Sequence, residues 1–154
     1  MTKKKKLSTQ GMHIFSRCIF ITKTAKETRN LGKKFASLLS IGDIIFLKGE
    51  LGSGKTTFAQ GIIEVFCNKK FARSPSFTII NEYNAINFKI FHIDLYRLEF
   101  SITLNTWIEE YLHTNNISII EWADKLLYTK INNYWNVKIE NKNLKRRIKI
   151  KKIK

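Results

Sequence analysis

Apolar positions in the first half of the chain repeat with the periods of strands and helices. Residues 13–21 form a β-rich run, which predicts a short strand. Thr24 and Glu27 match the capping-box pattern that begins a helix, and apolar residues at helical spacing continue it to about Leu39. A second apolar strand over 44–47 precedes residues 57–66, which again have helical spacing. The pattern therefore predicts the order strand, helix, strand, helix.

The second half of the chain is richer in strand patterns. Two β-rich runs, 77–83 and 88–94, flank a short Asn-containing segment, which predicts an antiparallel hairpin. The remaining predicted elements are a helix over 102–113, a buried strand over 117–120 and a final hairpin formed by 137–139 and 148–150. No internal repeat is visible.

The segment between the second strand and the second helix has the spacing of a phosphate-binding loop: Gly, four residues, Gly, Lys and then Ser or Thr. Glycines allow consecutive backbone N–H groups to turn inward around a phosphate. Lys55 adds a positive charge for the outer phosphates, and the Thr56 hydroxyl suits a Mg²⁺ ligand. The expected nucleotide-binding residues are Gly49, Glu50, Leu51, Gly52, Ser53, Gly54, Lys55, Thr56 and Thr57.

A strand and a helix on either side of this loop predict the fold class. We expect an α/β protein with a P-loop NTPase-like three-layer sandwich, in which antiparallel strands and hairpins flank parallel central strands. A chain of 154 residues fits one such domain. The expected division is a basic extension over 1–11, a P-loop domain over 12–150 and a basic tail over 151–154.

The formal net charge of +16 is uneven along the chain. Residues 2–6 hold four lysines and residues 142–154 hold eight Lys or Arg, with no acidic residue in either segment. Residues 7–141 hold 16 basic and 12 acidic residues, so the excess sits mainly at the two ends. Attraction to RNA or to an acidic partner is one interpretation. A genome rich in A and T, suggested by abundant Lys, Asn and Ile, is the other.

The cysteines and the hydropathy pattern indicate the cellular setting. Cys18 and Cys67 lie in apolar stretches without a paired spacing, which favours buried thiols over a disulfide or a zinc site. No apolar run approaches the about 20 residues of a membrane span, and no signal-peptide core follows the first lysines. The sequence predicts a cytosolic protein.

Two further segments contain residues that could respond to the state of a bound nucleotide. The hydroxyl-rich run 74–78 follows the P-loop helix, and its hydroxyls suit phosphate oxygens or metal-bound water in one nucleotide state. An ordinary turn entering a strand is the alternative. The run 92–97 ends a β-rich segment, where Asp94 suits Mg²⁺ or its water shell and Arg97 suits phosphate charge. A turn aspartate and a structural histidine at His92 are the alternatives for this run.

A third candidate follows the buried strand 117–120. Glu121 stands at the carboxyl end of that strand, where open α/β sheets carry their ligand chemistry, and Trp122 comes directly after it. A metal ligand or a residue that orients water is the functional interpretation of Glu121. A surface glutamate is the alternative.

Taken together in order and spacing, the P-loop 49–57, the runs 74–78 and 92–97 and the Glu121–Trp122 pair resemble the TsaE (YjeE) family of small bacterial ATPases. The resemblance extends over about residues 14–150. It implies ATP and Mg²⁺ as cofactors, and weak ATP hydrolysis by the chain alone. It also implies a role, with the TsaB–TsaD heterodimer, in the threonylcarbamoyladenosine modification of tRNAs that read ANN codons. Contact with tRNA is expected to be indirect, if it occurs.

The resemblance also implies roles for single residues. Lys55 and the loop amides would hold phosphates, Thr56 and Glu121 would lie at the metal, and Asp94 would be the Walker B-like carboxylate. Glu121, Asp94 and Lys55 are thus the expected catalytic residues, and Trp122 would lie near the nucleotide. The expected switch or partner-facing residues are Ser74, Pro75, Ser76, Phe77, Thr78, His92, Tyr96 and Arg97.

The chain departs from the family pattern at three positions. Ser76 replaces the usual Thr and keeps its hydroxyl, Ala123 replaces a frequent Pro, and Trp107 replaces a usual Gly, which leaves the path of the segment around Tyr111 open. Two other functions compete with the ATPase. A small P-loop kinase for a metabolite lacks support because the chain has no arginine-rich lid insertion, and a basic nucleic-acid-binding module lacks an RNA-stacking aromatic motif.

Overall fold

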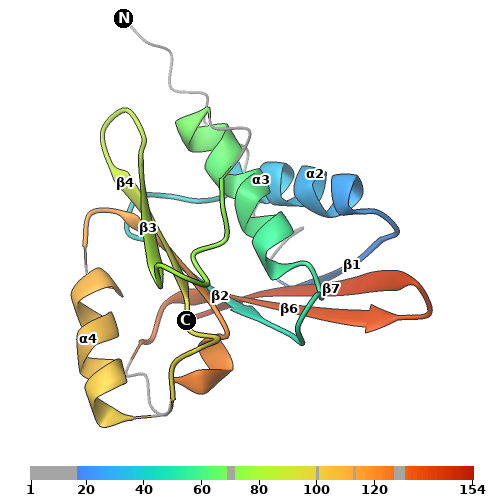
Figure 1. Ribbon diagram of the computed structural model, residues 1–154. Coiled ribbons are helices and arrows are strands. Elements are labelled where there is room, and N and C mark those ends of the chain that lie inside the picture. The colour runs from blue at the N-terminus through green and yellow to red at the C-terminus, as the bar shows by residue number, and fades with distance from the viewer. Residues whose placement is uncertain (1–16, 69–71, 100, 113, 127–130) are drawn as a thin grey trace, which may run out of the picture.

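A computed structural model describes residues 17–68, 72–99, 101–112, 114–126 and 131–154 of the protein (Figure 1). The predicted extension 1–11 and the start of the predicted first strand lie outside the described residues. The elements in chain order are β1 (Arg17–Thr22), α2 (Ala25–Ala36), β2 (Ile44–Lys48), α3 (Lys55–Cys67), β3 (Ile80–Asn84), β4 (Lys89–Asp94), α4 (Ile102–Leu112), β5 (Ile117–Glu121), the 3₁₀ helix η1 (Ala123–Lys125), β6 (Tyr134–Lys142) and β7 (Lys145–Ile153).

A seven-stranded mixed sheet in the order β1-β7-β6-β2-β5-β4-β3 runs through the molecule. The central strands β6, β2, β5 and β4 are parallel to one another. Strands β1, β7 and β3 pair antiparallel to their neighbours. This arrangement confirms the predicted parallel core with flanking antiparallel strands, and both predicted hairpins form.

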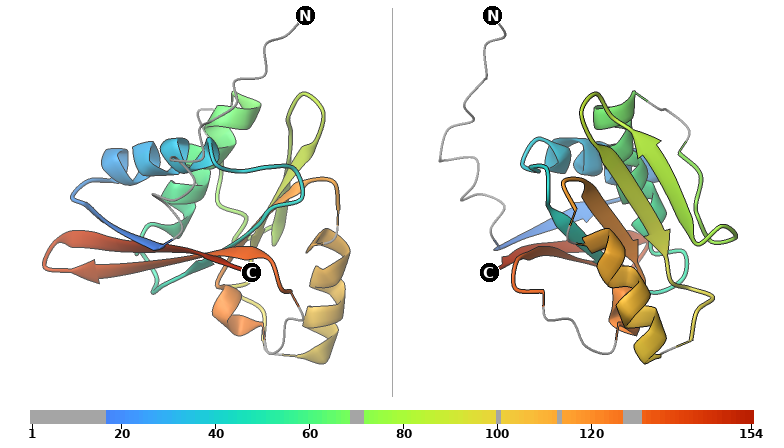
Figure 2. Two further views of the ribbon diagram at one scale, coloured as in Figure 1. Left: turned by 180° about the vertical axis from the view of Figure 1, so that it is seen from behind. Right: turned by 90° about the vertical axis from the view of Figure 1, so that its left-hand side faces the viewer.

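Helices cover both faces of the sheet and make three layers. Helices α2 and α3 lie on one face, and α4 lies on the other (Figures 1 and 2). Each face has its own apolar cluster: Phe35, Phe58 and Val137 belong to the first, and Phe46, Ile93 and Ile108 to the second. The alternation of β6 and β7 directs Val137 and Ile148 toward the α2 face, as their pattern predicts.

Helices α2 and α3 approach each other closely because each has a glycine at the crossing. A Cβ atom added to Gly32 would lie 2.2 Å from the carbonyl oxygen of Phe58, and one added to Gly61 would lie 2.1 Å from that of Arg29. Glu64 of α3 accepts from Arg29 and from Lys33 beside this contact, each at 2.8 Å. The start of α3, which follows the P-loop, is thereby fixed relative to α2.

The predicted start of α2 is confirmed in its main feature. The Thr24 side chain accepts from the backbone N–H of Glu27 at 3.0 Å, as an N-cap should. The Glu27 carboxylate accepts from the backbone N–H of Lys23 at 2.7 Å, one residue before the position that a capping box expects. The helix ends at Ala36, earlier than predicted, and the chain turns back through the residues that follow.

Several predicted boundaries change. Strand β3 begins at Ile80, later than expected, because Ile79 has a φ of 67° and donates its backbone N–H to Pro75 in a turn. Strand β7 continues to Ile153, so Lys151 and Lys152 lie in a strand beyond the expected tail boundary at 150. This corrects the boundary, because pairing with β1 on one side and β6 on the other extends the strand.

Trp107 lies inside the continuous helix α4, which resolves the path of that segment. Its ring packs against Tyr111 one turn later, with centroids 5.5 Å apart. Both rings belong to the apolar cluster under α4. None of the helices in the described parts of the chain has the length and apolar character needed to cross a bilayer.

Candidate functional site

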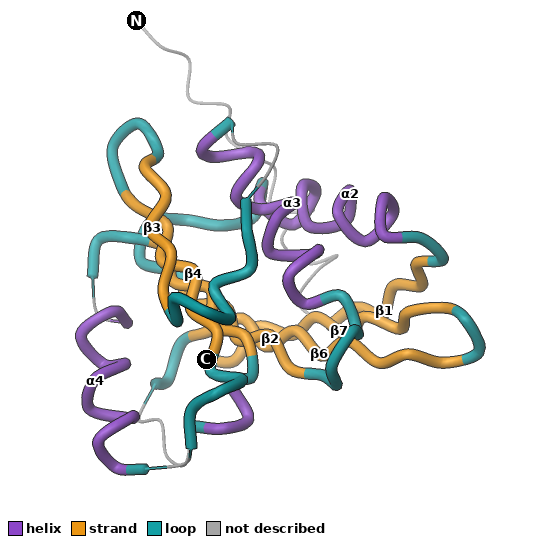
Figure 3. The backbone as a smooth tube through the Cα atoms, viewed as in Figure 1, coloured by secondary structure: helices purple, strands orange, loops and turns teal. Residues whose placement is uncertain are grey.

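The loop between β2 and α3 (teal in Figure 3) has the backbone that a phosphate cradle requires. Gly49, Gly52 and Gly54 have φ values of 146°, 73° and 104°, a region that favours glycine. A Cβ atom at Gly49 would also lie 2.2 Å from the carbonyl oxygen of Ile139. The predicted context is confirmed, since β2 precedes the loop and α3 begins at Lys55.

Lys55 lies inside this loop. Its Nζ donates to the carbonyl oxygens of Gly49 at 2.8 Å and Glu50 at 2.9 Å. The same ammonium lies 3.9 Å from the centroid of the Trp122 ring, a cation–π contact. Burial lowers the pKa of Lys55, while the charges of Glu121 and Asp94 act in the opposite direction.

Trp122 reaches Lys55 because of its backbone conformation. It has a φ of 59°, in the left-handed region, directly after β5 and before η1. Its ring also packs on Tyr96, with centroids 5.1 Å apart. The strained residue therefore joins the end of β5 to the loop after β4, and strain of this kind is common at functional sites.

Glu121 connects the P-loop helix to the sheet. It ends β5, is 2% exposed, and accepts from the Thr56 hydroxyl at 2.9 Å through Oε2. Its other oxygen, Oε1, lies 2.8 Å from His92 Nε2. The predicted metal pair, Thr56 and Glu121, is thus in direct contact.

Asp94 ends β4 beside Glu121, its register partner on β5. Its Oδ1 accepts from the backbone N–H of Tyr96 at 2.9 Å. Its Oδ2 accepts a short hydrogen bond from the Ser76 hydroxyl, and Ser74 lies 2.8 Å from Ser76. The hydroxyl-rich loop is therefore hydrogen-bonded to a predicted metal carboxylate, and its part in a switch stays a prediction.

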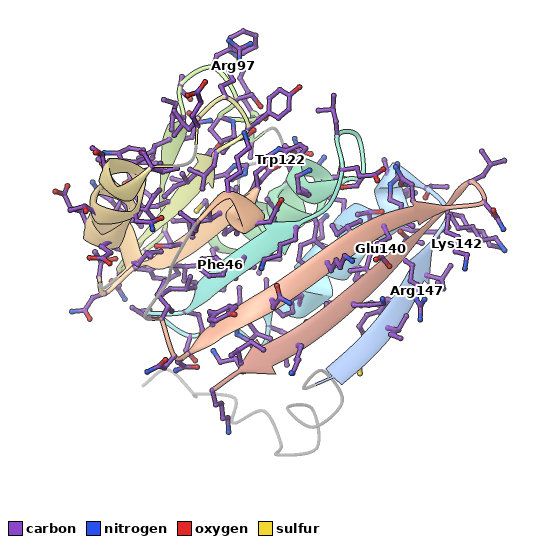
Figure 4. The ribbon with its side chains drawn as sticks, turned by 90° about the horizontal axis from the view of Figure 1, so that it is seen from below. Phe46, Arg97, Trp122, Glu140, Lys142 and Arg147 are labelled. Carbon is purple, nitrogen blue, oxygen red and sulfur yellow. The ribbon has the colours of Figure 1, made fainter. Side chains whose placement is uncertain are left out.

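These residues line one cavity of about 270 Å³. Its walls are Leu51, Gly52, Gly54, Lys55, Thr56, Thr57, Ser74, Ser76, Asp94, Tyr96, Glu121, Trp122 and Arg146. The structure thus brings together the P-loop, both predicted carboxylates and the two serines. Figure 4 shows Trp122 at the end of the sheet where these segments meet.

Other predicted residues lie outside the cavity lining. Thr78 donates to the Asn81 side chain at 2.9 Å, toward β3. Phe77 is 83% exposed, and the Arg97 guanidinium lies 4.2 Å from its ring centroid, so these two form an exposed pair. Pro75 accepts from Ile79 within the turn. Phe77 and Thr78 are thus exposed, whereas Pro75 is buried.

His92 corrects an expectation. It was expected to be a switch or partner-facing residue, but its side chain is 0% exposed. β4 is buried on both of its faces between β5 and β3, and the His92 ring reaches Glu121 of the neighbouring strand. His92 is therefore not exposed to a partner and instead contacts Glu121, and its expected part in a switch stays a prediction.

Arg146 is a cavity residue that sequence reasoning missed. It belongs to β7, far from the P-loop in sequence, and only the pairing of the final hairpin brings it to the site. No motif or spacing marks it. Its face on β7, shared with Ile148 and Ile150, is the only sequence signal that it points inward.

The chemistry of the site fits a magnesium nucleotide. Three glycines with positive φ leave a cradle of backbone N–H groups, Lys55 supplies a cation, and hydroxyl and carboxylate oxygens of Thr56, Glu121 and Asp94 are the ligand types that Mg²⁺ prefers. Within the described residues no three His, Cys, Asp or Glu side chains form a metal cluster.

Comparisons with known proteins agree with this site. A family model described as "Threonylcarbamoyl adenosine biosynthesis protein TsaE" matches residues 22–149. Proteins described as tRNA threonylcarbamoyladenosine biosynthesis protein TsaE are similar in sequence. The one from Bacillus subtilis is 37% identical over 102 residues, 66% of this chain and 64% of the relative. The one from Nostoc is 38% identical over 116 residues, 73% of this chain and 71% of the relative.

A solved structure is similar as well. The crystal structure of YdiB from Bacillus subtilis superposes with a TM-score of 0.70 and 28% identity, covering 92% of this chain and 89% of that chain. The chain thus spans nearly all of this structural neighbour. It spans 64% of the length of the Bacillus subtilis relative matched by sequence.

Proposed function

This chain belongs to the TsaE family, and we propose that it binds ATP with Mg²⁺ at the P-loop and hydrolyses it. We further propose that this ATPase is weak alone and acts with the TsaB–TsaD heterodimer in the threonylcarbamoyladenosine modification of tRNA. The observation that carries the proposal is the contact between Thr56 and Glu121 in the cavity that also holds Lys55.

Each cavity residue has a task under this proposal. The loop amides and Lys55 bind the phosphates, and the Thr56 hydroxyl and Glu121 carboxylate hold Mg²⁺. A Mg²⁺ ion held there would neutralise charge on the phosphates while the terminal phosphoryl group is transferred to water. His92 keeps the Glu121 carboxylate in one orientation through its 2.8 Å contact. Lys55 leaves the carbonyl oxygens of Gly49 and Glu50 when it binds a phosphate.

Asp94 connects this chemistry to the surface. Its carboxylate is held by Ser76 and by the backbone of Tyr96, so a change at the metal alters the hydrogen bonds of the serine loop. Phe77 follows Ser76 directly and is exposed with Arg97 beside it. We assign the Phe77–Arg97 pair as the partner-facing end of this connection, which gives ATP hydrolysis a route to the TsaB–TsaD heterodimer.

Glu121→Gln separates ATP hydrolysis from ATP binding. The substitution keeps the size of the side chain and removes the charge that holds Mg²⁺, so turnover measured with partner proteins should fall by roughly 100-fold or more. The Kd for ATP should change only a few-fold. Glu109→Gln on the exposed face of α4 makes the same chemical change away from the site and should leave both values unaltered. Unchanged turnover of Glu121→Gln at saturating Mg²⁺ would remove Glu121 from the site.

A further inference from the structure

Arg146 of β7 reaches the P-loop on the face of the sheet that α2 and α3 cover. It pairs with Thr22 of β1 and with Asn141 of β6 in the strand register. A Cβ atom added to Gly54 would lie 3.1 Å from Arg146 Nε and 3.2 Å from its Cδ. Its side chain therefore packs on the last loop glycine, directly before Lys55, and lines the cavity.

The guanidinium is available for a ligand. Arg146 Nε is buried and has no hydrogen-bond partner among the described residues. An arginine side chain has only donors, and its planar fork matches the oxygens of a phosphate. A buried donor without an acceptor is costly, so an anionic group beside Gly54 would satisfy Arg146 where the protein does not.

The position of Arg146 is fixed by neighbouring contacts. The hydroxyl of its strand partner Thr22 lies 2.8 Å from that of Thr28, and Thr28 also donates to the Thr24 carbonyl. The Thr28 methyl lies near Gly54 as well, 3.6 Å from an added Cβ. β1, the start of α2 and the P-loop therefore meet around Arg146, which makes it a pre-organised contact.

The strand order decides which end of a nucleotide Arg146 meets. Glu121 and Asp94 end β5 and β4 on one side of β2, whereas β6 and β7 lie on the other. Thr56 contacts Glu121, so the metal and the terminal phosphates belong on the β5 side. The nucleoside end then extends toward β6 and β7, and Arg146 lines the cavity from β7.

We propose that Arg146 binds the α-phosphate at the nucleoside end of the bound nucleotide. This inference rests on the proposed nucleotide site and adds a subsite to it. Because ADP and ATP share this phosphate, Arg146 should contribute to the binding of both. A residue that senses the terminal phosphate would instead favour ATP over ADP.

The test measures the Kd of the full chain for Mg-ADP and for Mg-ATP by titration calorimetry. Arg146→Ala should weaken both by a similar factor, roughly 10- to 150-fold, the range for a hydrogen bond to a charged group. Arg147→Ala is the matched control, because it changes the adjacent arginine on the opposite face of β7 (Figure 4) and should leave both values unaltered. Arg146→Lys keeps the charge without the fork and should give an intermediate loss for both nucleotides.

The outcomes separate this inference from the proposed function. If the unaltered chain binds neither nucleotide, the nucleotide site itself is wrong. If that chain binds both and Arg146→Ala binds them equally well, only the Arg146 assignment is overturned. A loss confined to ATP also overturns it, since that result would move Arg146 to the terminal phosphate. Circular dichroism checks that each variant is folded. If Arg146→Ala does not fold, the Kd values of Arg146→Lys decide the outcome.

Discussion

Exposed Phe77 and buried Asp94 are linked through the single residue Ser76. The hydroxyl of Ser76 donates to Asp94 inside the cavity, while the next side chain, Phe77, is 83% exposed under the Arg97 guanidinium. A large exposed aromatic ring beside a cation is typical of a protein contact, where such residues contribute most of the binding energy. The cavity residue Ser76 and the exposed residue Phe77 are thus neighbours in the sequence, joined by one peptide bond.

Phe77→Ala should weaken the response to partners without affecting the nucleotide. The loss of an aromatic anchor that becomes buried on binding typically costs about 2 kcal/mol or more of binding free energy, so the concentration of TsaB–TsaD heterodimer needed for half-maximal stimulation should rise about 30-fold or more. ATP turnover at several partner concentrations measures this. The Kd for ATP of the chain alone should stay the same.

A matched control uses another exposed apolar residue. Ile86 lies in the turn between β3 and β4 and is 94% exposed. Ile86→Ala should leave the partner response unchanged. Equal responses of Phe77→Ala and the unaltered chain would exclude the Phe77–Arg97 pair as a partner contact.

For single residues, the sequence predicts the sites formed by residues that are close together in the chain. The P-loop is a continuous motif whose glycines and lysine have fixed offsets, so Gly49 to Thr57 can be identified without the fold. Arg146 and the burial of His92 depend on strand pairing between distant segments. No offset in the sequence encodes that pairing, so neither the cavity position of Arg146 nor the burial of His92 can be predicted from the sequence alone.

Among the elements, α3 connects the active site to the packing of the helical layer. It begins at Lys55 and crosses α2 at Gly61, where backbone contacts leave no room for a side chain. The crossing therefore fixes where α3, which follows the phosphate cradle, lies relative to α2.

Gly61→Ala should destabilise the protein although alanine is the better helix former. The propensity gain is about 1 kcal/mol, but a Cβ atom 2.1 Å from the Arg29 carbonyl oxygen forces the helices apart. Overpacking of this kind costs about 1–3 kcal/mol or more, so the free energy of unfolding should fall. Urea denaturation followed by circular dichroism measures the change.

Asn30→Ala provides the comparison within α2. Asn30 is exposed, so the substitution improves helix propensity without adding a contact. It should leave stability equal or slightly higher. A Gly61→Ala protein at least as stable as the unaltered chain would contradict the close crossing.

The apolar periodicity of the sequence predicts most helices and strands but does not predict where they begin and end. The strand 117–121 and the helix α4 lie where the apolar pattern predicts them. The start of β3 depends instead on a turn with positive φ at Ile79, a β-branched residue that sequence rules assign to a strand. The end of β7 depends on two neighbours in the sheet that lysine-rich composition does not reveal.

At the scale of the molecule, much of the excess positive charge of the described residues lies on the β6–β7 part of the sheet. Much of the basic C-terminal segment forms β7, between β1 and β6. Lys138 and Lys149 face each other in the β6–β7 register, and Glu140 bridges them at 2.7 and 3.3 Å. Hydrogen bonds from these two lysines lower the pKa of Glu140. The view from below shows Glu140, Lys142 and Arg147 in this region (Figure 4).

The charged side chains and the nucleotide cavity lie on opposite faces of β7. Arg147 alternates with Arg146, which lines the cavity. The charge excess is therefore separate from the phosphate-binding residues, and the account of ATP binding does not depend on it. The central proposal is that the P-loop site hydrolyses ATP in response to partner proteins.

ATP turnover by the chain alone and with the TsaB–TsaD heterodimer tests that claim most directly. The unaltered chain should turn over slowly alone and faster with partners. Lys55→Ala should remove the stimulated turnover, because the P-loop lysine binds the outer phosphates. Lys34→Ala, an exposed lysine of α2, should retain it. Stimulated turnover that persists in Lys55→Ala, or an unaltered chain that does not respond to the heterodimer, would contradict the account.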